Sequence, residues 1–209
     1  MEQYQEYGYT SLAPNHAHRY ILPELLKMLH PEQNKAILDI GCGNGSLARA
    51  LLERGYNVYG IDASKQGIDL AAKIHPGRFF VQNIDTQTLP SAFRDIPFDT
   101  IVSTEVIEHL YAPRAFLVQC KAILSRQAGP KYLLLSTPYH GYLKNLALAL
   151  SGAMDAHFTA LWDGGHIKFW SRNTLSHLLE EGGFVVRDFR GAGRLPYLWK
   201  SMLLKAELI

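Results

Sequence analysis

The chain has 209 residues, of which 47% are hydrophobic, and this size and composition are typical of one globular α/β domain. The formal net charge of +2 is too small to indicate nucleic-acid binding by itself. With Cys42 and Cys120 as the only cysteines, a disulfide framework and a CxxC metal pair are excluded. The N-terminal residues lack the pattern of a signal peptide, and the longest apolar stretch, near residues 143–154, is too short to cross a bilayer. We therefore expect a soluble, cytoplasmic protein without a transmembrane segment.

The first expected element is an N-terminal helix over residues 15–30, whose apolar side includes Leu22, Leu25 and Leu29. The short apolar run at residues 37–40 then predicts a strand that is buried on both faces. Glycines 41, 43 and 45 follow at alternating positions, where the backbone can turn sharply and approach a ligand closely. Helical spacing of apolar residues resumes near residue 46. Strand, glycine loop and helix together predict a nucleotide-type cradle.

Strand-like runs alternate with helical patterns along the chain. The expected strands are 37–40, 58–61, 79–82, 100–103 and 132–136, and the expected helices lie near 46–54, 64–74 and 113–125. This alternation indicates a parallel sheet with helices on both faces. Ser171 is then a good N-cap for a helix that stops at Gly182, and strands at 184–189 and 202–208 are expected to be joined by a turn at 191–196. No domain boundary is visible, so we expect residues 1–209 to form a single domain.

The connection over residues 139–170 does not fit the alternation. It holds a short apolar helix candidate at 142–150 and the aromatic residues Phe158 and Trp162. Connections of this length are usually functional or disordered, and the apolar content argues against disorder. We predict a lid or a wall of the substrate pocket.

The cofactor is indicated by Asp39, two residues before the first glycine of the loop. A carboxylate at this place does not suit a pyrophosphate, but it suits a ligand that carries an ammonium group, and the glycine spacing differs from the dinucleotide motif G-x-G-x-x-G. The segment from Asp39 to Gly45 resembles the S-adenosylmethionine (SAM) motif of class I, Rossmann-like methyltransferases. The resemblance extends from about Ala36 to Phe184. It implies a mostly parallel, seven-stranded sheet with helices on both faces and an antiparallel last strand.

Ligands of an open parallel sheet bind beyond the carboxyl ends of its strands, so the strand ends supply the candidate cofactor site. Asp39 is expected to reach the methionine ammonium, directly or through water, and Asp62 to accept hydrogen bonds from the ribose hydroxyls. The resemblance implies that Asp85, or Asn83 if the register differs, faces the adenine. The full set of expected cofactor-binding residues is Asp39, Gly41, Cys42, Gly43, Gly45, Asp62, Ala63, Asn83, Ile84, Asp85 and Thr104.

After the fourth strand, residues 105–109 have the pattern E-x-x-E-H. At helical spacing, Glu105 would face both Glu108 and His109. Two carboxylates and an imidazole are suitable ligands for Mg²⁺, Mn²⁺ or Zn²⁺, and an oxygen nucleophile usually needs a metal or a base to remove its proton.

The E-x-x-E-H pattern resembles two branches of the fold, the ubiquinone-biosynthesis O-methyltransferases and the small-RNA 2′-O-methyltransferases. The second branch completes a metal site with a histidine just before an aromatic pair, and His166 stands in the matching place here. The candidate metal ligands are therefore Glu105, Glu108, His109 and His166. In relatives without a metal, His109 or His166 would act as the base or only hydrogen-bond a backbone carbonyl. The candidate catalytic residues are His109, Glu105 and His166.

Three functions remain open at this point. The leading one is SAM-dependent methyl transfer to an oxygen of a small molecule. The second is an RNA 2′-O-methyltransferase with a divalent metal, which should add a basic groove, whereas the lysines and arginines here are scattered. The third is a non-catalytic SAM-binding partner module, which the E-x-x-E-H cluster disfavours. No DNA partner is expected, and the sequence identifies neither the acceptor nor the oligomeric state.

Overall fold

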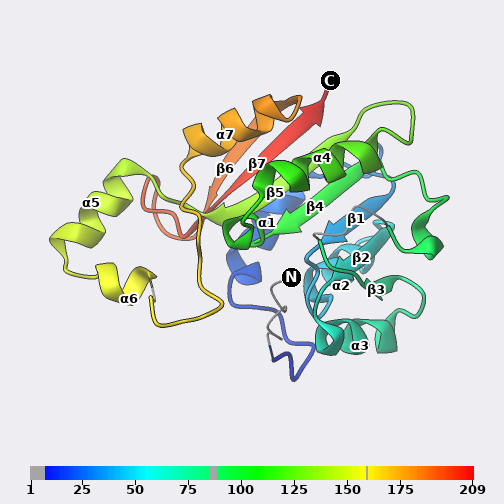
Figure 1. The fold of residues 1–209 in the computed structure, drawn as a ribbon, viewed down its shortest axis with the longest axis horizontal. Coiled ribbons are helices and arrows are strands. Elements are labelled where there is room, and N and C mark those ends of the chain that lie inside the picture. The colour runs from blue at the N-terminus through cyan, green and yellow to red at the C-terminus, as the bar shows by residue number, and fades with distance from the viewer. Residues whose placement is uncertain (1–7, 85–88, 159) are drawn as a thin grey trace.

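The computed structural model describes residues 8–84, 89–158 and 160–209. Its centre is a seven-stranded sheet of order β3-β2-β1-β4-β5-β7-β6 (Figure 1). The strands are β1 (Ile37–Ile40), β2 (Val58–Asp62), β3 (Phe79–Val81), β4 (Thr100–Thr104), β5 (Tyr132–Pro138), β6 (Phe184–Ala192) and β7 (Ser201–Leu208). The first five are parallel, and β7 runs antiparallel to both β5 and β6. The predicted fold class is confirmed, including the antiparallel last strand.

Helices cover both faces of the sheet. They are α1 (His18–Met28), α2 (Ser46–Leu52), α3 (Lys65–Ile74), α4 (Pro113–Leu124), α5 (Tyr142–Leu150), α6 (Met154–Phe158) and α7 (Arg172–Glu181), with short 3₁₀ turns η1 (Ser91–Phe93) and η2 (Ile107–His109). Apolar residues of α4 and α7 pack in one core cluster, and those of α1, α2 and α3 pack in a second. Strand β1 contributes Leu38 and Ile40 to the first cluster and Ile37 to the second, as expected for a strand that is buried on both faces.

Near the C-terminal end of the described chain, the predicted start of α7 is confirmed and the predicted turn between the last two strands is corrected. Ser171 caps α7 through a capping box with Thr174, as its position predicted. The turn expected at residues 191–196 is wrong, because β6 continues through Ala192 and pairs with Ser201 of β7. A glycine at position 191 permits this extension, since a Cβ there would overlap the ring of Trp199.

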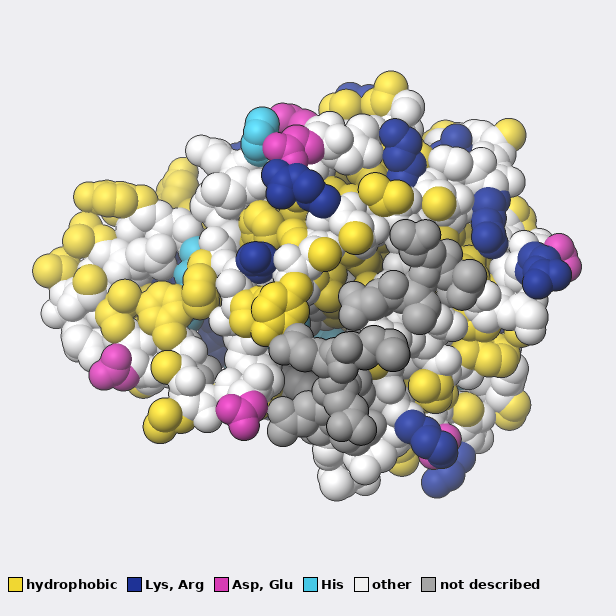
Figure 2. Space-filling view, viewed as in Figure 1, with side chains coloured by type: hydrophobic (Ala, Val, Ile, Leu, Met, Phe, Trp, Pro, Cys, Tyr) yellow, Lys and Arg dark blue, Asp and Glu magenta, His cyan; other side chains and the backbone are white. Residues whose placement is uncertain are grey.

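The two helices of the long connection lie at one side of the molecule, at the left of Figure 1. Hydrophobic side chains gather over them in Figure 2, and Tyr142, Leu143 and Leu150 are among the exposed ones. The buried residue of α5 is instead Lys144, whose Nζ donates to the carbonyl of Lys200 at 3.3 Å. None of the described helices combines the length and apolar character needed to span a membrane.

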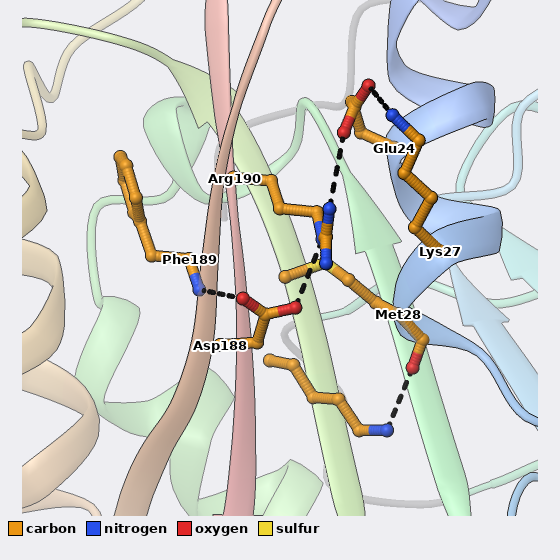
Figure 3. Close-up of polar contacts among 7 residues, drawn as sticks. Glu24, Lys27, Met28, Asp188, Phe189 and Arg190 are labelled. Atoms are coloured by element: carbon orange, nitrogen blue, oxygen red, sulfur yellow. Dashed lines mark hydrogen bonds and ion pairs between the residues drawn. The ribbon is translucent and has the colours of Figure 1, made fainter.

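Helix α1 is fixed to the antiparallel end of the sheet by polar contacts (Figure 3). The guanidinium of Arg190 lies 3.0 Å from the carboxylate of Asp188 and 3.8 Å from that of Glu24 in α1. Nearby, Lys205 Nζ donates to the carbonyl of Met28 at 2.8 Å. This carbonyl belongs to the last turn of α1, where no intrahelical donor is available and a cation is favourable.

The contact between Lys205 and Met28 leads to a prediction of stability. Lys205→Met keeps most of the aliphatic stem but leaves the Met28 carbonyl without its donor, so we expect the free energy of unfolding in urea to fall by about 1–3 kcal/mol. The matched control is Lys27→Met, which removes an exposed ion pair with Glu24. Exposed pairs of this kind contribute little. Equal losses in the two variants would contradict this account of how α1 is held.

Candidate active site

A cleft of about 660 Å³ opens at the carboxyl ends of β1, β2 and β4. This is where an open α/β sheet binds its ligands, and the volume is in the usual range for a cofactor site. Of the expected cofactor-binding residues, the cleft is lined by Gly41, Cys42, Gly43, Asp62, Ala63, Asn83, Ile84 and Thr104. Asp39 and Gly45 are buried and are not lining residues, and Asp85 lies outside the described residues.

The glycine loop is a cradle that side chains would fill. Gly41 and Gly43 have φ angles of 80° and 53°, in the left-handed region. A Cβ on Gly41 would overlap the side chain of Val106, and one on Gly43 would overlap the hydroxyl of Tyr9. The Gly43 amide donates to Asp62 Oδ2 at 2.7 Å, which ties the loop to the end of β2. Only glycine lets the Val106 and Tyr9 side chains approach the loop this closely, and the loop backbone forms part of the wall of the cleft.

Asp39 at the end of β1 is a buried carboxyl whose two oxygens have no hydrogen-bond partner within the described part of the chain. Burial, and secondly the negative charge of Asp62, raises the pKa of Asp39 to about 8. A buried carboxylate without partners is costly, and a cationic ligand group would relieve this cost. The residue thus fits the ammonium group of SAM.

The expected helical arrangement of residues 105–109 is wrong. Glu105 has a φ of 55°, and only η2, from Ile107 to His109, is helical. The carboxylate of Glu105 accepts hydrogen bonds from Ser136 Oγ at 2.8 Å and from Ser201 Oγ at 3.1 Å. These contacts with β5 and β7 decide its conformation. Burial raises the pKa of Glu105 to about 7, although the two hydroxyls act in the opposite direction.

Glu108, His109 and His166 come together beside the cleft, which the two histidines line while Glu108 is buried behind it. Each offers one potential ligand atom, and these three atoms lie within 4.8 Å of one another. Glu105 does not belong to this group. Two segments are joined here, because the Glu108 carbonyl accepts hydrogen bonds from the amides of Ile167 and Lys168, both at 3.0 Å.

The ionisation of these three side chains follows from their burial. Burial and the charge of Glu105 raise the pKa of Glu108 well above its usual range. Its Oε2 accepts from Thr137 at 3.0 Å, while its Oε1 is buried and has no partner among the residues described. Burial lowers the pKa of His109, and it lowers that of His166 to about 4. Both imidazoles are therefore neutral at pH 7, the form that binds metals and accepts protons.

Several lining residues carry no motif by which the sequence analysis could identify them. His18 lines the cleft from the start of α1, with its Nδ1 2.9 Å from Ser46 Oγ. Tyr111 lines it after η2. The predicted pocket wall is represented by residues 162–167, while α5 and α6 lie apart from the cleft. The contact of His18 with Ser46 spans 28 residues and arises only when α1 packs beside the glycine loop.

Comparison with known proteins agrees with this architecture. A family model described as "Methyltransferase domain" matches residues 14–188. A ubiquinone biosynthesis O-methyltransferase of Dinoroseobacter shibae is 31% identical over 172 residues, which are 79% of this chain and 66% of that protein. One from Cereibacter sphaeroides is 28% identical over 186 residues, 85% of this chain and 71% of that protein. The chain thus spans about two thirds of the length of these relatives.

The solved structures show the same fold at low identity. Magnesium protoporphyrin IX methyltransferase from Synechocystis, with bound SAH, superposes with a TM-score of 0.64 at 20% identity and covers 90% of this chain and 82% of its own. The methyltransferase domain of a bacterial Hen1 (CtHen1) gives a TM-score of 0.63 at 22% identity, covering 90% and 97%.

The sheet order and these structures define a class I, Rossmann-like methyltransferase fold. The chain belongs to the methyltransferase-domain family and is a SAM-dependent methyltransferase, distantly related to the ubiquinone biosynthesis O-methyltransferases. The predictions of the family, of the type of enzyme and of SAM as cofactor are confirmed.

The Asp39 carboxyl makes stability depend on pH in the ligand-free protein. In the unfolded chain it ionises near pH 4, whereas in the folded protein its pKa is raised to about 8. The folded state therefore binds more protons between these values, and the contribution of this group to stability falls as the pH rises from about 4 to about 8. We expect Asp39→Asn to raise the melting temperature at pH 8 and to leave it nearly unchanged at pH 4.

The control for this measurement is Asp95→Asn, at an exposed position. It should change the melting temperature by the same small amount at both pH values. An Asp39→Asn effect of equal size at pH 4 and pH 8 would show that Asp39 does not hold its proton in the folded state.

Proposed function

We propose that the enzyme transfers the methyl group of SAM to an oxygen atom of a small molecule. The observation that carries this proposal is the cluster of Glu108, His109 and His166, whose two histidines line the same cleft as Thr104 and the glycine loop. A hydroxyl acceptor has to lose its proton as it takes the methyl group, and this cluster can remove it. The names of the curated relatives, O-methyltransferases of ubiquinone biosynthesis, support an oxygen acceptor.

In this proposal the cofactor lies along the strand ends. Asp39 faces the ammonium, Asp62 the ribose hydroxyls, Asn83 and Ile84 the adenine, and Thr104 flanks the sulfonium. The unpartnered oxygens of Asp39 support this orientation. Bound SAM supplies an electrophilic methyl group, so the main task of the cleft is to align an acceptor with it and to exclude water.

Glu108, His109 and His166 are also a suitable ligand set for a divalent cation, with two nitrogens and one oxygen. The buried Glu108 Oε1, which has no partner in the described regions, and the neutral imidazoles fit this role. A bound cation would lower the pKa of an acceptor hydroxyl. Without a cation, the imidazole of His109 or His166 takes the proton directly. The fourth expected ligand, Glu105, is held by Ser136 and Ser201.

The walls of the cleft favour a small, partly apolar acceptor over RNA. No lysine or arginine is among its lining residues in the described part of the chain, so nothing there can neutralise a phosphate backbone. Trp162 lines this cleft and also a second cavity of about 710 Å³, together with Asp155, Phe158, Ala160 and Leu161. An acceptor with an aromatic ring and an apolar substituent fits both.

Substitutions in the cluster test its part in the reaction. For His166→Ala and Glu108→Gln, we expect kcat with catechol as acceptor to fall by about 10²- to 10⁴-fold, because removal of the hydroxyl proton is impaired. The affinity for S-adenosylhomocysteine, measured by calorimetry, should change little. His177→Ala, in α7 and exposed, is the control. Equal rates with aniline, thiophenol and catechol would overturn the assignment of an oxygen acceptor.

Chelation distinguishes between a bound cation and a histidine base as the group that promotes loss of the acceptor's hydroxyl proton. If a cation is bound, dialysis of untagged protein against EDTA should abolish methylation of catechol, and one of Mg²⁺, Mn²⁺ or Zn²⁺ should restore it. Calorimetric titration of the same cation into His166→Ala should show weakened binding. Full activity after chelation would contradict the metal site and leave the imidazole as the base.

A further inference from the structure

We propose that His18, the first residue of α1, binds the carboxylate at the methionine end of SAM through its Nε2–H group. The proposal concerns the cofactor and does not depend on which acceptor is methylated. It would give the N-terminal helix a direct part in SAM binding, in addition to its packing role at β6 and β7.

The position of His18 is set by the glycine loop. The side chain lines the same cleft as Gly41 and Gly43. Its Nδ1 lies 2.9 Å from the hydroxyl oxygen of Ser46, the residue that follows the loop directly and begins α2. This hydrogen bond joins the imidazole to the residue that follows the loop, and it therefore orients the ring relative to the loop.

The contact with Ser46 also selects the tautomer. In the described part of the structure, the Ser46 hydroxyl has no other hydrogen-bond partner, so its proton is available to Nδ1. Burial lowers the pKa of His18 to about 4, so the ring is neutral at pH 7 and carries one proton. If Nδ1 accepts from Ser46, that proton is on Nε2. Nε2 has no partner among the described residues and is the ring's free donor.

The chemistry of the methionine end explains why a donor is needed at this place. Its ammonium and carboxylate are attached to the same carbon, so a carboxylate must lie near the ammonium that Asp39 fits. The two asparagines beside the loop are committed or exposed. The Asn44 amide nitrogen donates to the carbonyls of Ser11 and Ala13 at 2.8 and 2.9 Å, and Asn15 is exposed. His18 is held rigidly and keeps a free N–H, which suits an anionic oxygen.

Calorimetry without an acceptor tests the proposal. Two ligands are compared: SAM, and decarboxylated SAM, which keeps the ammonium and lacks the carboxylate. His18→Ala should weaken SAM binding by about 10- to 100-fold, the range for one hydrogen bond to a charged group. Binding of decarboxylated SAM should weaken by less than about twofold, because the interaction partner is already absent from this ligand. His18→Gln, which retains an N–H donor, should lose less affinity for SAM than His18→Ala.

The matched control is His16→Ala, at an exposed position on the same segment, which should bind both ligands as the wild type does. Equal weakening for SAM and decarboxylated SAM would show that His18 acts by packing against the loop, and unchanged SAM binding would show that it makes no contact. Either result overturns the proposal. If His18→Ala does not fold, the affinities of His18→Gln and Ser46→Ala for SAM and for decarboxylated SAM are compared instead. A loss of affinity for SAM alone supports the proposal, and an equal loss for both ligands overturns it. These binding measurements contain no acceptor, so their outcome does not bear on the proposal of an oxygen acceptor.

Discussion

The cleft depends on the close approach of the glycine loop to the chain that follows β4. Strand β1 pairs with β2 on one side and with β4 on the other, so the chain must leave its end by a sharp turn. The amides of Gly41 and Cys42 both donate to the Ile61 carbonyl, at 2.8 and 3.1 Å, and Val106 occupies the space where a Cβ of Gly41 would lie. Any larger residue at position 41 would push these segments apart. Glycine at position 41 therefore allows the loop and the chain after β4 to stay in contact.

Three acids lie around this turn, and they differ in whether the protein supplies hydrogen-bond partners for their carboxyl oxygens: Asp39 and Glu108 are buried, and Glu105 is partly buried. Glu105 is satisfied by the hydroxyls of Ser136 and Ser201, so its carboxylate belongs to the packing of β5 and β7. Asp39 and Glu108 each have buried oxygens without a partner in the described chain. Such groups destabilise a fold unless a ligand completes them. We interpret the two incomplete acids as ligand-facing groups, Asp39 toward the cofactor and Glu108 toward the acceptor.

The sequence was sufficient wherever the determining interactions are local. Buried strands such as β1 show as short, mostly apolar runs, and the cap of α7 at Ser171 follows from side-chain chemistry within one turn. The helical reading of residues 105–109 failed because Glu105 is placed by Ser136 and Ser201, which are 31 and 96 residues away in sequence. His18 escaped notice for the same reason. Its contact with Ser46 joins α1 to the start of α2 on one face of the sheet, and no local pattern encodes it.

The two halves of the cleft therefore differ in how they are built. The part of the cleft proposed for the cofactor comes mainly from strand ends and loops between residues 41 and 84, and it is completed by Thr104 of β4 and His18 of α1. The part proposed for the acceptor joins residues 105–111 to residues 162–167, and the Glu108 carbonyl, which accepts from Ile167 and Lys168, holds the two segments together. The helices α5 and α6 lie in the connection between them and away from the cofactor half. We expect substitutions in this connection to change the wall proposed for the acceptor and to leave the cofactor cradle intact, as when one fold serves different functions.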